Sequence, residues 1–87
     1  MTDDVFRELG FDSAEASNLR LRAELMLAAK KYIKENNLTQ KQAAEIMGVD
    51  QPRINKLLAG HIELFTLDKL VVMLERAKIH VKLKLAA

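Results

Sequence analysis

The sequence has no cysteine, no tryptophan and one proline among its 87 residues. Without cysteine, disulfides and thiolate metal sites are excluded. The two histidines, His61 and His80, are far apart in sequence and belong to no metal-binding motif, so we expect no metal and no cofactor. No apolar run approaches the ~18 residues that a membrane span needs, and the acidic first residues do not resemble a secretory signal. We therefore expect one small cytoplasmic domain that does not contact a membrane.

Charge is unevenly distributed along the chain. Residues 1–16 contain five acidic side chains against Arg7 alone, whereas residues 17–87 contain 13 basic and 7 acidic side chains. The basic body is compatible with nucleic acid, and equally with an ordinary solvated surface. The glutamates and aspartates on the expected helices have no nucleophile or phosphate loop beside them. We therefore expect that the protein is not an enzyme.

Helix-capping patterns divide the middle of the chain. Asp12-x-x-Glu15 and Thr39-x-x-Gln42 are capping boxes, and Asp50 and Thr66 are suitable N-cap residues. Gly48 occupies a position where a left-handed C-cap residue is needed, and Pro52 falls in the first turn after Asp50. These signals predict helices over residues 13–36, 40–47 and 51–59, and a fourth helix after Thr66.

The two ends of the chain have other patterns. Residues 5–11 are apolar-rich but too short to assign, and residues 5–9 are a weak strand candidate. Residues 79–85 alternate apolar and polar side chains, which predicts a strand with one buried face. We accordingly divide the chain into an acidic segment 1–12, a helical domain 13–78 and a C-terminal strand 79–87. The fold class is mostly α, with about four helices and this strand.

Residues 40–59 have the spacing of a helix-turn-helix motif. Ala44 is small where two helices must approach, Gly48 makes the turn, and Val49 fills the corner between the helices. Ile54 and Leu57 form the buried face of the second helix. Its opposite face contains amides, cations and no acid, which suits presentation to the major groove of DNA. The residues of that face are Gln51, Pro52, Arg53, Asn55 and Lys56.

The stretch from Leu38 to Gly60, LTQKQAAEIMGVDQPRINKLLAG, resembles the lambda-repressor-like, Xre-type helix-turn-helix family almost position by position. The segment from Phe65 to Leu70 and the final strand are similar to a compact subgroup of antitoxins that occur beside RelE/ParE-like toxins. Phage repressors carry another helix where this chain has the expected strand. The resemblance implies a lambda-repressor-like core. It also implies that the protein is a transcriptional repressor that binds double-stranded DNA.

The resemblance also implies roles for individual side chains. Gln40 matches a glutamine that contacts phosphate, and Gln51 matches one that reads adenine. Pro52 can offer only apolar contact, as to a thymine methyl group. Arg53 and Lys56 can reach guanine or phosphate, and Asn55 faces the backbone. His61 follows the recognition helix and is either a phosphate contact or a surface loop residue.

The partners follow from the same features. A lone strand leaves its backbone groups unpaired, so we expect a homodimer on a palindromic operator in which two strands pair. The dimerisation residues are then Ile79, Val81, Leu83 and Leu85. The alternative function is a protein-interaction module that neutralises a RelE/ParE-like toxin. For that role, the acidic N-terminal segment offers apolar anchors; alternatively, Phe6 and Phe11 simply pack on the long helix.

Overall fold

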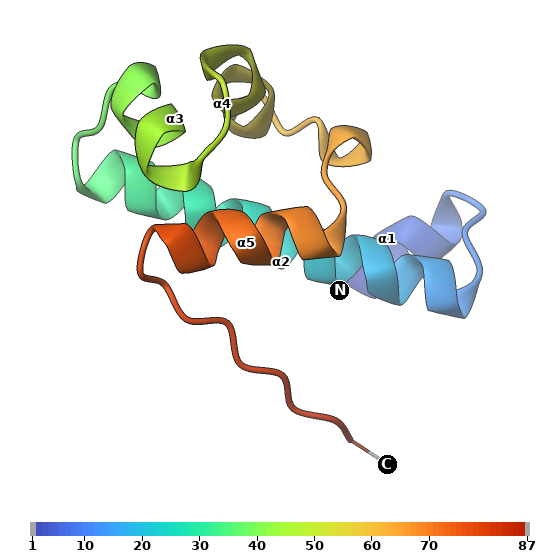
Figure 1. Cartoon of the computed structure of the whole chain (residues 1–87). Helices are drawn as coiled ribbons and strands as arrows, with labels where there is room; N and C mark the ends of the chain where they lie inside the picture. Colours follow the sequence, from blue (N-terminus) through green and yellow to red (C-terminus); the bar gives the residue numbers. More distant parts are fainter. Residues whose placement is uncertain (1, 87) are drawn as a thin grey trace.

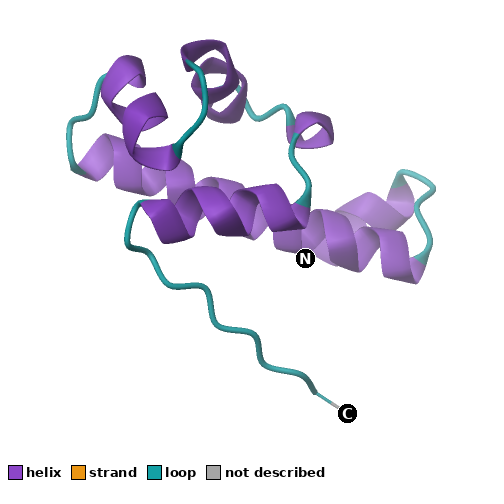
Figure 2. Ribbon diagram, in the orientation of Figure 1, coloured by secondary structure: helices purple, strands orange, loops and turns teal. Residues whose placement is uncertain are grey.

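The computed structural model describes residues 2–86; Met1 and Ala87, at the ends of the segments 1–12 and 79–87, lie outside the described residues. Within residues 2–86, five α-helices and one short 3-10 helix follow one another (Figures 1 and 2). Helices α3 and α4 lie together on one side of α2 and α5, and α1 folds back along the start of α2. The bounds are α1 Thr2–Glu8, α2 Ser13–Glu35, α3 Gln40–Met47, α4 Gln51–Leu58, η1 Ile62–Leu64 and α5 Leu67–Arg76.

Helix α1 replaces the weak strand candidate at residues 5–9, and that interpretation was wrong. Phe6 is partly buried, and its ring meets Phe11 edge-on at a centroid distance of 6.3 Å. Such a short helix is unstable alone, so its packing along α2 stabilises it. Val5 and Leu9, one turn apart, remain exposed. The acidic segment is therefore folded against the body, with an apolar pair facing solvent.

Helix α2 is the support on which the other helices pack. Its N-terminus has the predicted capping box, in which Asp12 accepts from the Glu15 amide at 2.8 Å. The helix ends one residue before the predicted end. Met26, Ala29 and Ile33 lie on one face of α2 and are buried in the core. Leu25, Ala28 and Tyr32 are partly buried beside them, as their helical spacing predicts.

The helix-turn-helix unit forms as the sequence predicts. Thr39 and Gln42 cap α3 reciprocally, with bonds of 2.9 and 3.1 Å. Gly48 ends α3 in the left-handed conformation at φ 72°, which glycine adopts without Cβ strain. Asp50 accepts from the Arg53 amide at 2.8 Å and begins α4. These local bonds fix where both short helices begin and where the chain turns between them.

Phe65 and the buried side chains of α5 complete the hydrophobic core. Phe65 is fully buried, and Thr66 caps α5 through the amide of Lys69 at 3.3 Å. Leu70, Met73 and Leu74 of α5 are buried against α2 and α3. Met26, Met47 and Met73 are buried in the core. No helix in the described part of the chain combines the length and hydropathy that crossing a membrane requires.

The C-terminal strand is not present within residues 2–86. Residues 79–86 leave α5 as an extended, unpaired segment, on the side away from α3 and α4 (Figures 1 and 2). A strand needs a neighbouring strand, and no other segment of the described chain is extended alongside this one. Ile79 and Val81 pack against the core, whereas Leu83 and Leu85 are 82% and 86% exposed. Of the four apolar residues in the alternating pattern, only the first two are therefore covered by the core.

Candidate nucleic-acid interface

One face of α4 is buried in the core, so the opposite face is directed to solvent. Ile54 and Leu57 are almost completely buried, and Ala43 and Ala44 of α3 are buried with them. Small side chains at 43 and 44 let the two helix backbones approach. Val49, half-buried at the turn, packs against the same core. This packing fixes which side chains of α4 face solvent.

Four of the five residues predicted on this face are exposed. They are Gln51, Pro52, Asn55 and Lys56. Gln51 is the first residue of α4, so its side-chain amide lies at the N-terminal end of this helix. Lys56 lies in the last turn. The face offers amide donors and acceptors, one apolar ring and one cation.

Gln40 is also exposed, at the first position of α3. No acidic side chain lies in the first turn of α3 or of α4. Helix N-termini carry a partial positive charge and unpaired amides, which favour a nearby phosphate. Gln40 therefore lies where a contact to the DNA backbone is chemically suitable.

Arg53 lies differently from its neighbours. Its side chain is only partly exposed, and Nη1 donates to the carbonyl oxygen of Leu64 at 3.0 Å. The guanidinium carbon is 5.7 Å from the centre of the buried Phe65 ring. The structure thus places Arg53 against the segment that follows α4, with one of its donors already used. No local pattern of residue types predicts this contact, because the partner is eleven residues away.

His61 lies in the loop after α4 and forms a close pair with an acid. Its Nδ1 is 3.1 Å from Oε1 of Glu63, and the two side chains are 44% and 64% exposed. The pKa of the Glu63 carboxyl lies below its usual range. A hydrogen bond from the backbone N–H of Glu63 is the main cause, and a hydrogen bond with the ring of His61 is the second. The charge of Lys56 acts in the same direction. Sequence reasoning missed Glu63, although its position two residues after His61 was a possible signal. The Glu63 carboxylate therefore lies close enough to Lys56 to interact with its charge.

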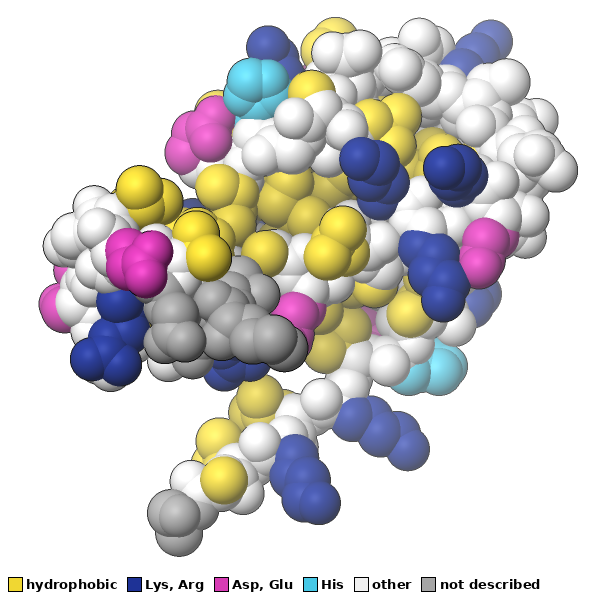
Figure 3. All heavy atoms as spheres, turned by 180° about the vertical axis from the view of Figure 1, so that it is seen from behind, with side chains coloured by type: hydrophobic (Ala, Val, Ile, Leu, Met, Phe, Trp, Pro, Cys, Tyr) yellow, Lys and Arg dark blue, Asp and Glu magenta, His cyan; other side chains and the backbone are white. Residues whose placement is uncertain are grey.

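The predicted dimerisation residues begin next to a second carboxylate. Glu75 on α5 accepts from the backbone N–H of Val81 at 2.8 Å, and its other oxygen is 2.9 Å from Nδ1 of His80. The bond from Val81, and then the ring of His80, lowers the pKa of Glu75. Glu75 thereby fixes the start of the C-terminal segment. Beyond it, Leu83 and Leu85 are exposed and alternate with Lys82 and Lys84. Figure 3 shows apolar and basic side chains along this protruding segment.

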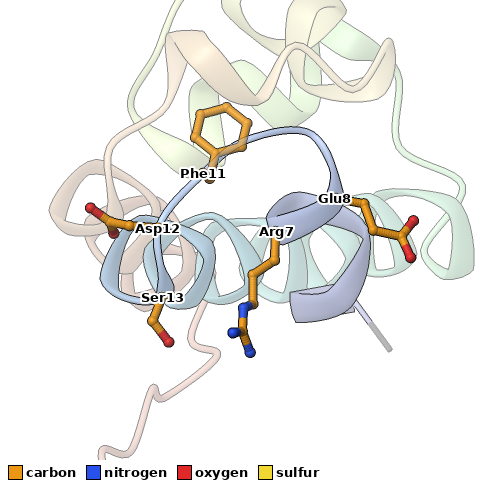
Figure 4. A pocket seen from close by; sticks show the side chains of 5 residues that line it. All are labelled: Arg7, Glu8, Phe11, Asp12 and Ser13. Atoms are coloured by element: carbon orange, nitrogen blue, oxygen red, sulfur yellow. The ribbon is translucent and has the colours of Figure 1, made fainter.

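A hollow of about 530 Å³ lies at the turn between α1 and α2. Its side chains point away from one another rather than toward a common point (Figure 4). They belong to Arg7, Glu8, Phe11, Asp12 and Ser13. Among the described residues, no three His, Asp or Glu side chains gather as metal ligands would.

Comparison with known proteins agrees with this geometry. No curated protein matches the chain. A family model described as a helix-turn-helix domain matches residues 5–86, which is nearly the whole chain. The match includes the second half of α1 and the C-terminal segment as well as α3 and α4. The chain therefore belongs to this family of helix-turn-helix domains, whose fold implies DNA binding and transcriptional regulation.

Proposed function

We propose that the protein is a transcriptional repressor that binds double-stranded DNA sequence-specifically. It represses its own operon as a type II antitoxin. The observation that supports DNA reading most strongly is the exposed row on α4, held outward by the burial of Ile54 and Leu57. Gln51 reads adenine through its amide, and Pro52 contacts a thymine methyl group. Lys56 contacts guanine or phosphate. Gln40, Asn55 and His61 contact the DNA backbone.

A binding assay with the DNA upstream of the protein's own reading frame tests this function. The protein should bind this DNA far more tightly than random DNA of equal length at the same salt concentration. Lys56→Ala should weaken the complex, and the exposed Lys31→Ala on α2 is a control of equal charge. Equal affinity for upstream and random DNA would contradict sequence-specific repression.

The active form that we propose is a homodimer on a palindromic site. The unpaired segment 79–86 and the exposed Leu83 and Leu85 support pairing of two C-terminal segments about a two-fold axis. Ile79 and Val81 would anchor each segment to its own core and set its register. Pairing would place two recognition helices roughly 34 Å apart, one turn of DNA.

Sedimentation of a charged variant tests this interface. Leu83→Asp with Leu85→Asp should give a folded monomer with weakened operator affinity, because neither side chain packs in the core. Val72→Asp, at another exposed apolar position, is the control and should remain dimeric. A dimer that survives the double change would refute pairing through this segment.

The second candidate function, neutralisation of a RelE/ParE-like toxin, is supported by the N-terminal segment. Its acidic composition suits a basic partner, and Val5 on α1 and Leu9 just after it offer exposed anchors. Val5→Ser with Leu9→Ser should abolish neutralisation of the toxin encoded beside the protein and leave operator binding intact. Persistence of both activities would place any toxin surface elsewhere. The packing of α1 on α2 makes these substitutions cleaner than deletion of residues 1–11.

A further inference from the structure

The side chain of Arg53 on α4 turns toward the body of the domain. Its partners belong to the segment between α4 and α5: the Leu64 carbonyl oxygen at 3.0 Å and the Phe65 ring at 5.7 Å. Gln51, Pro52, Asn55 and Lys56 on the same helix are all exposed. Arg53 therefore has a structural environment that the other residues of this face lack.

We propose that Arg53 is a positioning residue that sets the orientation of α4 on DNA, instead of reading a base itself. This inference rests on the proposed DNA-binding function. The bond to Leu64 closes a loop from the first turn of α4 to the residue just before Phe65. Phe65 is fully buried, so it supplies a fixed point in the core. Arg53 thereby ties the base-reading end of α4 to the body of the domain.

The chemistry of the contact requires arginine. A planar guanidinium can lie over an aromatic ring while one N–H points at a carbonyl oxygen. A lysine ammonium carries the same charge but cannot stack in this way. Without Arg53, the start of α4 is held by the Asp50 cap, the turn and Ile54 alone. Small rotations of α4 would then become accessible, and every base contact would weaken together.

Three possible roles of Arg53 predict different binding patterns. A base-reading arginine determines the preference at one base pair, so its loss relaxes specificity there. A phosphate-contacting arginine contributes about 0.9 to the salt dependence of the binding constant. A positioning arginine does neither, because it contacts no DNA. Its loss lowers affinity by the same factor for the operator and for every single-base variant of it.

The experiment compares Arg53→Met, Arg53→Lys and the control Lys56→Met against the operator, its single-base variants and a range of salt concentrations. Both Arg53 variants should bind the operator about tenfold more weakly, the scale of a lost charged hydrogen bond, with unchanged base preferences. Arg53→Met should keep the wild-type salt slope. Lys56→Met should instead change either the slope or one base preference.

Amide hydrogen exchange without DNA provides a second, independent measurement. Exchange at residues 62–65 should accelerate in Arg53→Met and in Arg53→Lys, and should be unchanged in Lys56→Met. A changed preference at one base pair, a slope reduced by about 0.9, or wild-type exchange in both Arg53 variants would each overturn the positioning role. If the wild-type protein binds no operator, the proposed function fails, while the exchange measurement still tests the bracing of this segment.

Discussion

The guanidinium of Arg76 lies directly against Gly48, so that a Cβ atom on residue 48 would overlap its Nη1. Gly48 is the left-handed residue of the helix-turn-helix, and Arg76 is the last residue of α5. The contact joins the turn of the DNA-binding motif to the end of the helix from which the C-terminal segment leaves.

Gly48→Ala should destabilise the fold by about 1–2 kcal/mol, because alanine is strained at positive φ and its Cβ displaces Arg76. Gly60→Ala is the matched control, since Gly60 has φ 81° and open space around the Cβ position. Thermal unfolding should show a larger cost at 48 than at 60, and Arg76→Ala should remove the difference. Equal costs in the wild-type background would contradict the contact.

Ala44→Leu should overpack the crossing of α3 and α4 and cost about 1–3 kcal/mol in the free energy of unfolding. Ala44 is buried between the helices, whereas the adjacent Glu45 is exposed. Glu45→Leu should therefore change stability by less than about 0.5 kcal/mol. Denaturant unfolding of both variants measures the difference, and a stable Ala44→Leu protein would be inconsistent with this packing.

Glu75 should make the attachment of the C-terminal segment depend on pH. Its pKa is lower in the folded protein than the usual value of 4.5, chiefly because Val81 donates to it. Its contribution is therefore complete above about pH 4.5 and is lost as the pH falls through the lower folded pKa. Exchange of the Val81 amide should accelerate over that acidic range. In Glu75→Gln this pH dependence should be absent, and its persistence would show that another group controls the segment.

Glu63 should weaken DNA binding, because its charge lies beside His61 and acts on Lys56. The lowered pKa of its carboxyl keeps it ionised at neutral pH. Glu63→Gln should raise operator affinity by about two- to fivefold at low salt, the modest scale of exposed ion pairs, and by less at high salt. Glu45→Gln, which removes the same negative charge from α3, is the control. Unchanged affinity at low salt would mean that Glu63 lies too far from the DNA to matter.

The sequence predicted the features that local chemistry determines. The caps at Asp12, Thr39, Asp50 and Thr66 all form, and Gly48 has the expected conformation. Each depends on residues within one turn of the chain, so a pattern of residue types suffices.

Other features depended on residues distant in sequence and were not predictable in the same way. Helix α1 forms because it packs on α2, and the C-terminal segment is not a strand because no other extended segment within residues 2–86 lies beside it. The direction of Arg53 depends on where Leu64 returns after the loop. Residue type and helical position place Arg53 on α4, but they do not show which way its side chain turns.

The most direct measurement of the central claim is the affinity of Gln51→Ala for the operator and for random DNA at one salt concentration. Gln51 is exposed at the start of α4, and an amide paired with adenine discriminates by about 1–3 kcal/mol. We predict that the variant loses about tenfold or more on the operator and far less on random DNA. Equal losses on both DNAs would contradict base reading by this helix.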